Sequence, residues 1–382
     1  MSTLQNRRIQ ISLPATGDEE WQALREPLAT GWLTQGPKVA QFERDFAQRH
    51  SVRHALATTS CTTALHLILA AMEIGPGDEV IVPAFTWVAT ANVVLYVGAT
   101  PVLVDVDPQS FNIDPAQVAA KVTARTRAII AVHLFGLAAD IDAIAAAAPG
   151  VPIIEDAACA AGSAYKDRPT GSLGLAGAFS FHPRKSVTTG EGGMVTTNDS
   201  ALAKRADALR NHGASISEEQ RHAGPRPYLL AEFNLLGFNY RMTDLQGAVG
   251  VVQFAKLDAF IDERARWAAF YRDALAKLSW LRLPSVPEGW RHGWQSFVCT
   301  VDPERAPMTR NAIMERLQSQ GVSTRPGTHA IHMLGLYRER FGFGADDFPN
   351  ARDCDRNTMA IPLHNRMTAD DYSYVVRALC AL

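Results

Sequence analysis

The sequence has few cysteines and no long apolar run. The five cysteines (Cys61, Cys159, Cys299, Cys354 and Cys380) are odd in number, widely spaced and without a CxxC pair, which disfavours a disulfide framework and a zinc site. Nowhere do about 18 apolar residues run without a charge, and the N-terminal stretch lacks the apolar segment of a signal peptide. We therefore predict a soluble, cytoplasmic chain that binds no metal and does not cross a membrane.

An excess of charge of either sign is also missing. Lysine and arginine number 37 against 39 acidic residues, which gives a formal net charge of -2 at pH 7. Without a basic surface the chain is poorly suited to nucleic acid or an anionic membrane, so we expect a small molecule or another protein as partner. A chain of 382 residues, 47% of them hydrophobic, can bury a large core and is long enough for two or three domains.

Short apolar runs alternate with longer helix-like stretches, a pattern typical of an α/β fold whose mainly parallel sheet carries helices on both faces. The predicted strands are 55–60, 79–83, 101–106, 127–132, 152–156, 177–181 and 194–198, and the predicted helices are 62–72, 86–96, 115–122, 141–148 and the long region 241–278. We place a large domain in residues 1–250 and a smaller α/β domain, with strands and two more helices after residue 280, in residues 251–382. The turn after the first strand lacks GxGxxG, which argues against a dinucleotide-binding module.

One lysine occupies a special sequence context. Lys185 follows the apolar ribbon 179–181 and precedes the Gly-rich loop 190–193. A lysine that forms a Schiff base needs a fixed position and a lowered pKa, which a partly buried loop beside a cationic cofactor can supply. Most lysines are solvated surface residues, but the flanking segments favour a catalytic role for Lys185.

The predicted strand 152–156 ends in two acids, Glu155 and Asp156. Open α/β sheets bind ligands outside the carboxyl ends of their strands. A buried carboxylate needs a partner, and a protonated pyridine nitrogen is a suitable one. Strand alternation directs Glu155 to the opposite face, where a helix N-terminus or a surface salt bridge would explain it. Asp156 is therefore the candidate ligand residue.

Two further segments suit a ligand that carries a phosphate and an aromatic ring. The turn 58–65 is rich in small polar residues between a strand and a helix, and its backbone N–H groups could bind an anion. An ordinary helix cap is the alternative for this turn. Trp87 follows an apolar strand and could stack on an aromatic ring, although a plain core position would equally suit it.

In this order and spacing, these segments resemble the DegT/StrS-type sugar aminotransferase family, which are fold type I enzymes dependent on pyridoxal 5'-phosphate (PLP). The resemblance runs over most of the chain, through the motifs GWLTQGPKVAQFERDFA, TTSCTTALHL, GDEVIVPAFTWVATANVV, GATPVLVDVDPQSFNID, HLFGLAADIDAI, IIEDAACAAGS, FSFHPRKSVTTGEGGMVTTND and GFNYRMTDLQGAVGVVQ, and weakly through YRERFGF and IPLH. It implies a fold type I architecture, PLP as the cofactor, and a homodimer with shared active sites.

The resemblance also implies roles for individual residues. Lys185 would carry the cofactor as a Schiff base, Asp156 would pair with the pyridine nitrogen and Trp87 would stack on the ring. Phosphate contacts are implied for Cys61, Thr62, Ser180 and, from the neighbouring subunit, Asn239.

Two cysteines depart from the family pattern. Cys61 stands where a glycine is common and still offers its backbone N–H, whereas Cys159 stands where a glutamine is common. A thiol is a weak hydrogen-bond donor, so Cys159 is either a cofactor contact or a plain packing residue. Some relatives carry histidine at the position of Lys185 and catalyse deoxygenation, so the lysine indicates transamination.

The predicted reaction moves an amino group from L-glutamate to a nucleotide-linked keto sugar. Two alternatives stay open: an aminotransferase for a cyclitol ketone or free sugar, and a non-catalytic PLP-binding sensor, which would normally carry a DNA-binding domain or basic patch. Arg325, His329 and His332 are candidates to line the substrate pocket from the small domain, and buried or surface histidines are the alternative for the last two.

Overall fold

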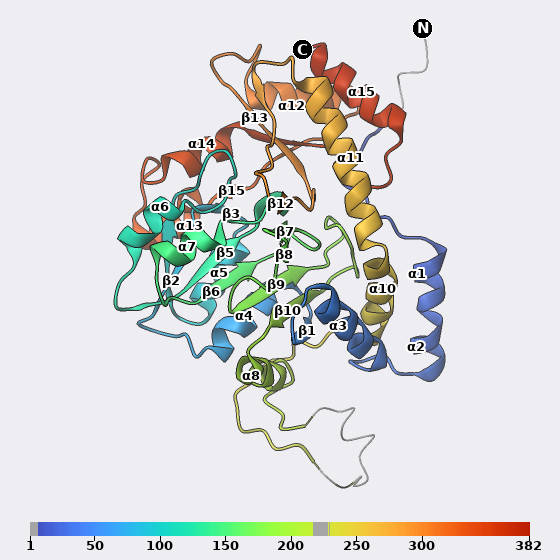
Figure 1. Ribbon diagram of the computed structural model, residues 1–382, viewed down its shortest axis with the longest axis vertical. Coiled ribbons are helices and arrows are strands. Elements are labelled where there is room, and N and C mark those ends of the chain that lie inside the picture. The colour runs from blue at the N-terminus through green and yellow to red at the C-terminus, as the bar shows by residue number, and fades with distance from the viewer. Residues whose placement is uncertain (1–6, 217–227, 229) are drawn as a thin grey trace.

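The computed structural model describes residues 7–216, 228 and 230–382. Residues 1–6, 217–227 and 229 of the predicted large domain lie outside the described part. A seven-stranded sheet forms the centre, in the order β1-β10-β9-β6-β5-β2-β4 (Figure 1). Five neighbouring strands run parallel and only β10 is antiparallel to both of its neighbours. The strands are β1 (His54–Thr58), β2 (Glu79–Pro83), β4 (Thr100–Val104), β5 (Thr126–Val132), β6 (Ile153–Asp156), β9 (Ala176–Ser180) and β10 (Gly193–Thr197).

Helices pack on both faces of this sheet because its strands are apolar on both sides. In β5, Ile130 and Val132 join one hydrophobic cluster, whereas Ile129 and Ala131 join another on the opposite face. The first face is covered by α4 (Cys61–Ala71), α5 (Ala89–Tyr96) and α8 (Ser200–Arg210). The second is covered by α3 (Pro37–Arg49), α6 (Pro115–Val118), α7 (Ile141–Ala147) and α10 (Asp244–Ala255). The predicted sandwich of a mainly parallel sheet between helices is confirmed.

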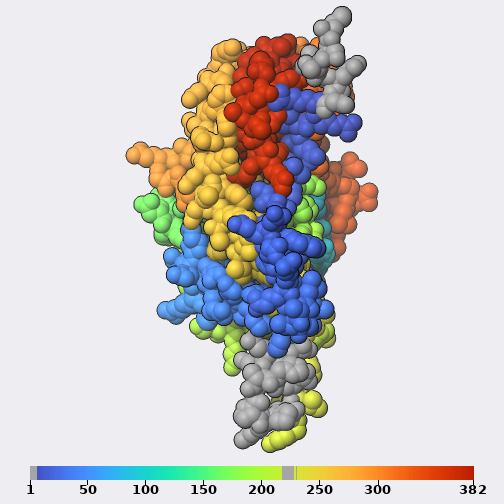
Figure 2. All heavy atoms as spheres, turned by 90° about the vertical axis from the view of Figure 1, so that its right-hand side faces the viewer, coloured from blue at the N-terminus to red at the C-terminus, as the bar shows by residue number. Residues whose placement is uncertain are grey.

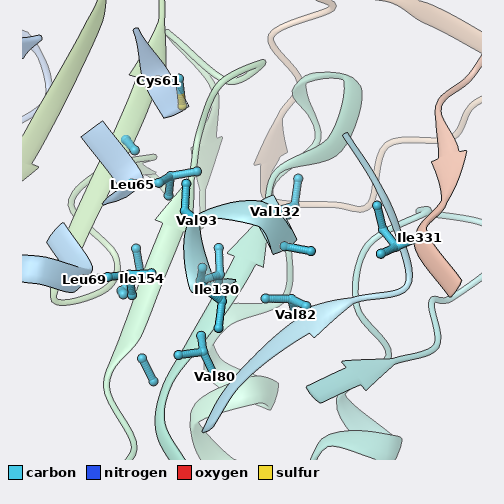
Figure 3. Packing of buried hydrophobic residues seen from close by; sticks show 14 of the residues in the cluster. Cys61, Leu65, Leu69, Val80, Val82, Val93, Ile130, Val132, Ile154 and Ile331 are labelled. Carbon is cyan, nitrogen blue, oxygen red and sulfur yellow. The ribbon is translucent and has the colours of Figure 1, made fainter. Parts of the chain in front are cut away.

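Figure 3 shows how the first face is packed. Leu65 and Leu69 of α4 and Val93 of α5 lie over Val80, Val82, Ile130 and Ile154 from three parallel strands, and all are buried. Cys61, at the start of α4, lies at the edge of the same cluster. The core therefore fixes the N-terminus of α4 relative to the carboxyl ends of β2, β5 and β6.

Three helix boundaries differ from the sequence prediction. The helix expected over 86–96 begins at Ala89, because Phe85–Thr86 forms the short strand β3 and pairs with β15 (His329–Ala330), far along the chain. The helix expected over 115–122 ends at Val118 and continues as a single 3-10 turn, Ala119–Lys121. The region 241–278 is two helices, α10 and α11 (Leu257–Leu275), which separate at Lys256.

A second sheet lies in the C-terminal third of the chain. Its four strands are all antiparallel to their neighbours, in the order β11 (Leu281–Arg282), β13 (Phe297–Val301), β16 (Thr358–Ile361) and β14 (Arg325–Pro326). It packs with α11, α12 (Arg310–Ser319) and α15 (Ala369–Cys380) around a separate hydrophobic cluster, and α11 and α15 lie side by side on the surface (Figure 2). Residues 281–382 contain four helices rather than the expected two, since α13 (Gly335–Phe341) and α14 (Pro349–Asn357) also form.

The N-terminal segment joins this second cluster. Ile9 is buried there and forms a parallel bridge with Val322. The helices α1 (Asp18–Ala23) and α2 (Arg25–Thr30) then lead back to α10, and the small strands β7 (Ala164–Tyr165), β8 (Arg168–Pro169) and β12 (Trp290–Arg291) form a third sheet. The division into domains 1–250 and 251–382 stays a prediction.

Candidate active site

Asp156 occupies the last position of β6, at the carboxyl edge of the parallel strands. Its side chain is only 5% exposed. The Thr90 hydroxyl donates to Oδ2 at 2.7 Å, the Ala158 backbone N–H donates to Oδ1 at 3.2 Å, and the Cys61 thiol donates to Oδ1 at 3.9 Å. An ionised carboxylate accepts about four hydrogen bonds, so roughly one acceptor position is left for a ligand.

Lys185 lies in the turn after β9, where its Nζ donates to the Cys159 sulfur at 3.1 Å. Burial opposes the charged ammonium, but the interactions with Cys159, among them a hydrogen bond, and with Cys61 and Asp156 outweigh it, so the pKa of Lys185 lies above its ordinary value. The protein groups alone therefore do not lower the pKa of Lys185, and the lowering expected beside a cationic cofactor stays a prediction. Any lowering must come from positive charge that a cofactor brings.

Cys61 lies close to both Asp156 and Lys185. Burial raises the pKa of its thiol well above the ordinary value, the Asp156 charge raises it further, and the Lys185 charge opposes the shift. Each of these charges must be close to act on a buried sulfur. The structure thus brings Cys61, Asp156, Cys159 and Lys185 into one cluster, although they come from three separate segments of the sequence.

The turn before α4 presents unused hydrogen-bond donors. Ser60 and Thr63 form a reciprocal capping box, in which the Ser60 hydroxyl accepts from the Thr63 N–H and the Thr63 hydroxyl accepts from the Ser60 N–H. Within the described residues, the backbone N–H groups of Cys61 and Thr62 have no acceptor. Two free donors at the positive end of a helix suit a phosphate.

The strand register places Ser180 near the turn that precedes α4. It ends β9 opposite Gly193, which in turn lies opposite Thr58 at the end of β1. A Cβ on Gly193 would come within 2.4 Å of the Ser60 backbone, so only glycine permits this close approach. The Ser180 hydroxyl and the start of α4 therefore share one edge of the sheet.

Trp87 lies outside the core, with 59% of its surface exposed. Its indole packs edge-on against the exposed His329 at a centroid distance of 5.5 Å. The interpretation of Trp87 as a core residue is thus wrong, and its indole is available to a ligand. His332 points elsewhere: it is buried, and its Nε2 lies 3.2 Å from the Ala345 carbonyl oxygen.

Asn239 does not join the cluster within its own chain. It is exposed, bridges to Asn211 and accepts a hydrogen bond from Arg241 at 3.1 Å. It lies beside the C-terminal end of α8, where the Phe238 N–H donates to the Leu209 carbonyl and the Tyr240 N–H donates to the Arg210 carbonyl. A contact between Asn239 and a phosphate would have to be made in a second subunit.

Glu155 points away from Asp156, as strand alternation predicts, but it is fully buried rather than at the surface. The backbone N–H groups of Gly171, Leu173 and Gly174 donate to its two oxygens at 2.5 to 2.8 Å, and His133 Nε2 lies 2.9 Å away. The expected surface salt bridge or helix terminus is therefore wrong. Glu155 anchors the loop that leads into β9.

Sequence reasoning missed Thr90 and Thr86. Both are buried, and their hydroxyls lie 3.0 Å apart behind Asp156. The available signal was two threonines four residues apart in an otherwise apolar segment that follows a buried strand.

These residues fit PLP. A buried carboxylate with an acceptor position left matches a pyridinium N–H, and the free N–H groups of Cys61 and Thr62 match a phosphate. Lys185 supplies the amine. Among the described residues, no group of three or more acidic, histidine or cysteine side chains could hold a metal ion. None of the described helices combines the length and apolar character of a membrane span.

Known proteins of similar sequence and structure agree with this chemistry. The family model of the DegT/DnrJ/EryC1/StrS aminotransferases matches residues 14–380. The Bacillus subtilis (strain 168) spore coat polysaccharide biosynthesis protein SpsC is 40% identical, over 98% of this chain and 97% of its own. DesV from S. venezuelae, solved in complex with a ketimine intermediate, is 30% identical and superposes with a TM-score of 0.88 over 98% of both chains.

The PLP form of a putative sugar aminotransferase, Spr1654 from Streptococcus pneumoniae, is 27% identical with a TM-score of 0.89, over 98% of this chain and 100% of that one. The family match covers nearly the whole chain, and the cluster around Lys185 has the donors and acceptors that PLP requires. The chain therefore belongs to the DegT/DnrJ/EryC1/StrS aminotransferase family and is a PLP-dependent aminotransferase.

Proposed function

We propose that the protein transfers the amino group of L-glutamate to a nucleotide-linked keto sugar, with Lys185 and Asp156 as its catalytic residues. The observation that carries the proposal is the cluster of Lys185, Asp156 and Cys61 at the carboxyl edge of the sheet. Bound PLP supplies an electron sink for the charge that develops when the substrate loses its Cα proton.

Residues of the chain transfer the proton and hold the cofactor. Lys185 Nζ, once released from the cofactor, takes the proton from the amino donor and returns it. Asp156 would keep the ring nitrogen of the cofactor protonated, and Trp87 would contact the ring. The N–H groups of Cys61 and Thr62 and the Ser180 hydroxyl would hold the phosphate. Cys159 Sγ accepts from the Lys185 ammonium while the lysine is free.

Two arginines near the site suit anionic substrates. Arg184 precedes Lys185, and Arg325 lies in β14. Burial and the repulsion of Arg325 lower the pKa of Arg184, and neither guanidinium has an ion-pair partner within the described residues. Unpaired guanidinium groups favour carboxylates and phosphates, so both the donor and a diphosphate tail would be attracted here.

A sugar acceptor is supported by the relatives. SpsC is named for polysaccharide biosynthesis and Spr1654 is described as a putative sugar aminotransferase. Trp87 and the neighbouring His329 are both exposed, which suits a sugar whose nucleotide extends into solvent.

The acceptor is tested by the second half-reaction. With the cofactor loaded as its amine by glutamate, nucleotide-linked 3-keto and 4-keto hexoses should restore the aldehyde absorbance faster than pyruvate, oxaloacetate or a free cyclitol ketone. Single-turnover stopped-flow absorbance gives the rates directly. Faster reoxidation by pyruvate or oxaloacetate would refute the sugar assignment, and a preference for the cyclitol would replace it with the alternative acceptor.

The proposal also includes a homodimer in which Asn239 completes the neighbour's phosphate site. Large hydrophobic side chains crowd the segment that carries Asn239, and all are more than half exposed: Tyr228 77%, Leu230 74%, Phe233 64% and Leu236 93%. Exposed apolar groups of this size typically mark an interface. Contact with a second copy would bury them.

We expect Leu236→Asp to weaken the dimer by about tenfold or more, because it places a charge in an apolar interface. Leu236 is so exposed that the fold of one subunit should be unaffected. Sedimentation velocity over a range of concentrations measures the change, with Leu336→Asp on α13 as the exposed control. A wild-type protein that is monomeric and fully active at working concentration would contradict the shared site.

A further inference from the structure

Thr90 is placed to act on Asp156 from the side that faces the protein interior. It lies in the first turn of α5, it is 0% exposed, and its hydroxyl donates to Asp156 Oδ2 at 2.7 Å. A hydroxyl in a helix can instead bond to the carbonyl one turn back. The Thr90 hydroxyl is directed at the carboxylate.

The direction of the next hydrogen bond follows from counting protons. Thr86 Oγ1 and Thr90 Oγ1 lie 3.0 Å apart, and either could be the donor by distance alone. A hydroxyl carries one proton, and that of Thr90 is given to Asp156. Thr86 must therefore donate to Thr90, which makes an ordered chain from Thr86 through Thr90 to the carboxylate. Each donor in such a chain polarises the next and strengthens its bond.

Both carboxylate oxygens are thereby fixed. Oδ2 accepts from Thr90, and Oδ1 accepts from the Ala158 N–H and the weakly bonding Cys61 thiol. The carboxylate is therefore held in one orientation, because each of its oxygens has its own donor.

We propose that Thr90 is a positioning residue for Asp156, and that Thr86 reinforces it, so that the proton shared with the cofactor's ring nitrogen stays on nitrogen. This inference rests on the proposed role of Asp156. Without the Thr90 hydroxyl, Oδ2 of Asp156 loses the donor that stabilises its negative charge, and the shared proton is drawn toward the carboxylate. The ring then withdraws less electron density from the nitrogen that links the cofactor to Lys185. That linking nitrogen therefore keeps its proton up to a higher pH.

The test uses the holoenzyme and the pH titration of its cofactor absorbance, which requires no substrate. Thr90→Val keeps the shape of the side chain and removes only the hydroxyl, whereas Thr90→Ser keeps the hydroxyl. We expect Thr90→Val to raise the midpoint of the titration by about one pH unit and to slow the glutamate half-reaction about tenfold, as loss of a hydrogen bond to a charged group implies. The KM for glutamate should change little, and Thr90→Ser should behave like the wild type.

Two further variants keep the outcome interpretable. Thr86→Val should shift the midpoint in the same direction by a smaller amount, and it tests the chain even if Thr90→Val does not fold. Unchanged midpoints in folded Thr90→Val or Thr86→Val would overturn the inference. Asp156→Asn separates this failure from that of the proposed function: if Asp156→Asn moves the midpoint and Thr90→Val does not, only the positioning role is lost, whereas no movement in either removes the role of Asp156 itself.

Discussion

Replacing Lys185 with alanine is expected to abolish transamination and to remove the absorbance of the lysine-bound cofactor. Lys185 would lose two functions at once, the covalent attachment of the cofactor and the transfer of the substrate proton. Proton transfer by a positioned group alone contributes about 10²- to 10⁴-fold, so the residual rate should fall by at least this factor. Steady-state turnover with glutamate and the visible spectrum of the purified protein measure both effects.

A surface lysine provides the control for this experiment. Lys166 is half-exposed and pairs with Asp142 at 2.8 Å, remote from the cluster around Asp156. Lys166→Ala should retain the spectrum and the activity of the wild type. A Lys185→Ala variant that still gave a cofactor adduct after borohydride reduction would assign the covalent attachment to another lysine.

Replacing Asp156 with asparagine is expected to slow the half-reaction with glutamate by roughly 10²- to 10³-fold, the usual effect of removing one preorganised electrostatic partner. Asparagine has nearly the same shape, but its single oxygen can accept from Thr90 or from Ala158 and not from both. The neutral amide no longer holds the ring nitrogen protonated, and the developing negative charge loses its sink. Stopped-flow absorbance under single-turnover conditions isolates this step.

The adjacent acid gives a matched comparison. Glu155→Gln should leave the rate of the folded enzyme near that of the wild type, because Glu155 faces away from the cluster. It should instead lower the free energy of unfolding by about 1–3 kcal/mol, since buried backbone N–H groups lose a charged acceptor. Thermal unfolding followed alongside activity separates the two. If Asp156→Asn kept a normal half-reaction rate, or if Glu155→Gln were the slower of the two, the catalytic assignment of Asp156 would fail.

The parts of the fold that could be predicted from the sequence depend on local patterns. Apolar runs such as 127–132 and 153–156 are buried on both faces and lie in the parallel sheet, as their composition predicts. The antiparallel insertion of β10 between β1 and β9 depends instead on the pairing of β10 with the distant strand β1. The late start of α5 has the same origin, because Phe85–Thr86 is drawn into a strand by His329–Ala330.

The same distinction applies to the site. Asp156 and Lys185 could be singled out because each ends or follows a recognisable apolar strand. The contact between Lys185 and Cys159 could not be, since it joins two loops whose approach depends on β6 and β9 being neighbours. Glu155 was placed on the correct face, but its burial depends on the loop 171–174, which the pattern of the strand does not reveal.

The position of β10 affects the order in which the molecule can fold. Thr58 at the end of β1 and Ser180 at the end of β9 both lie opposite Gly193, and Thr58 is far from Gly193 in the sequence whereas Ser180 is near it. Such non-local pairing forms slowly, because a long loop must close before its contacts can compensate for the lost chain entropy. The helix α4 can form early with β1, yet its N-terminus reaches Ser180 only once β10 has entered the sheet. The ability to capture a phosphate is therefore acquired late in folding and belongs to the assembled sheet rather than to the N-terminal strand and helix alone.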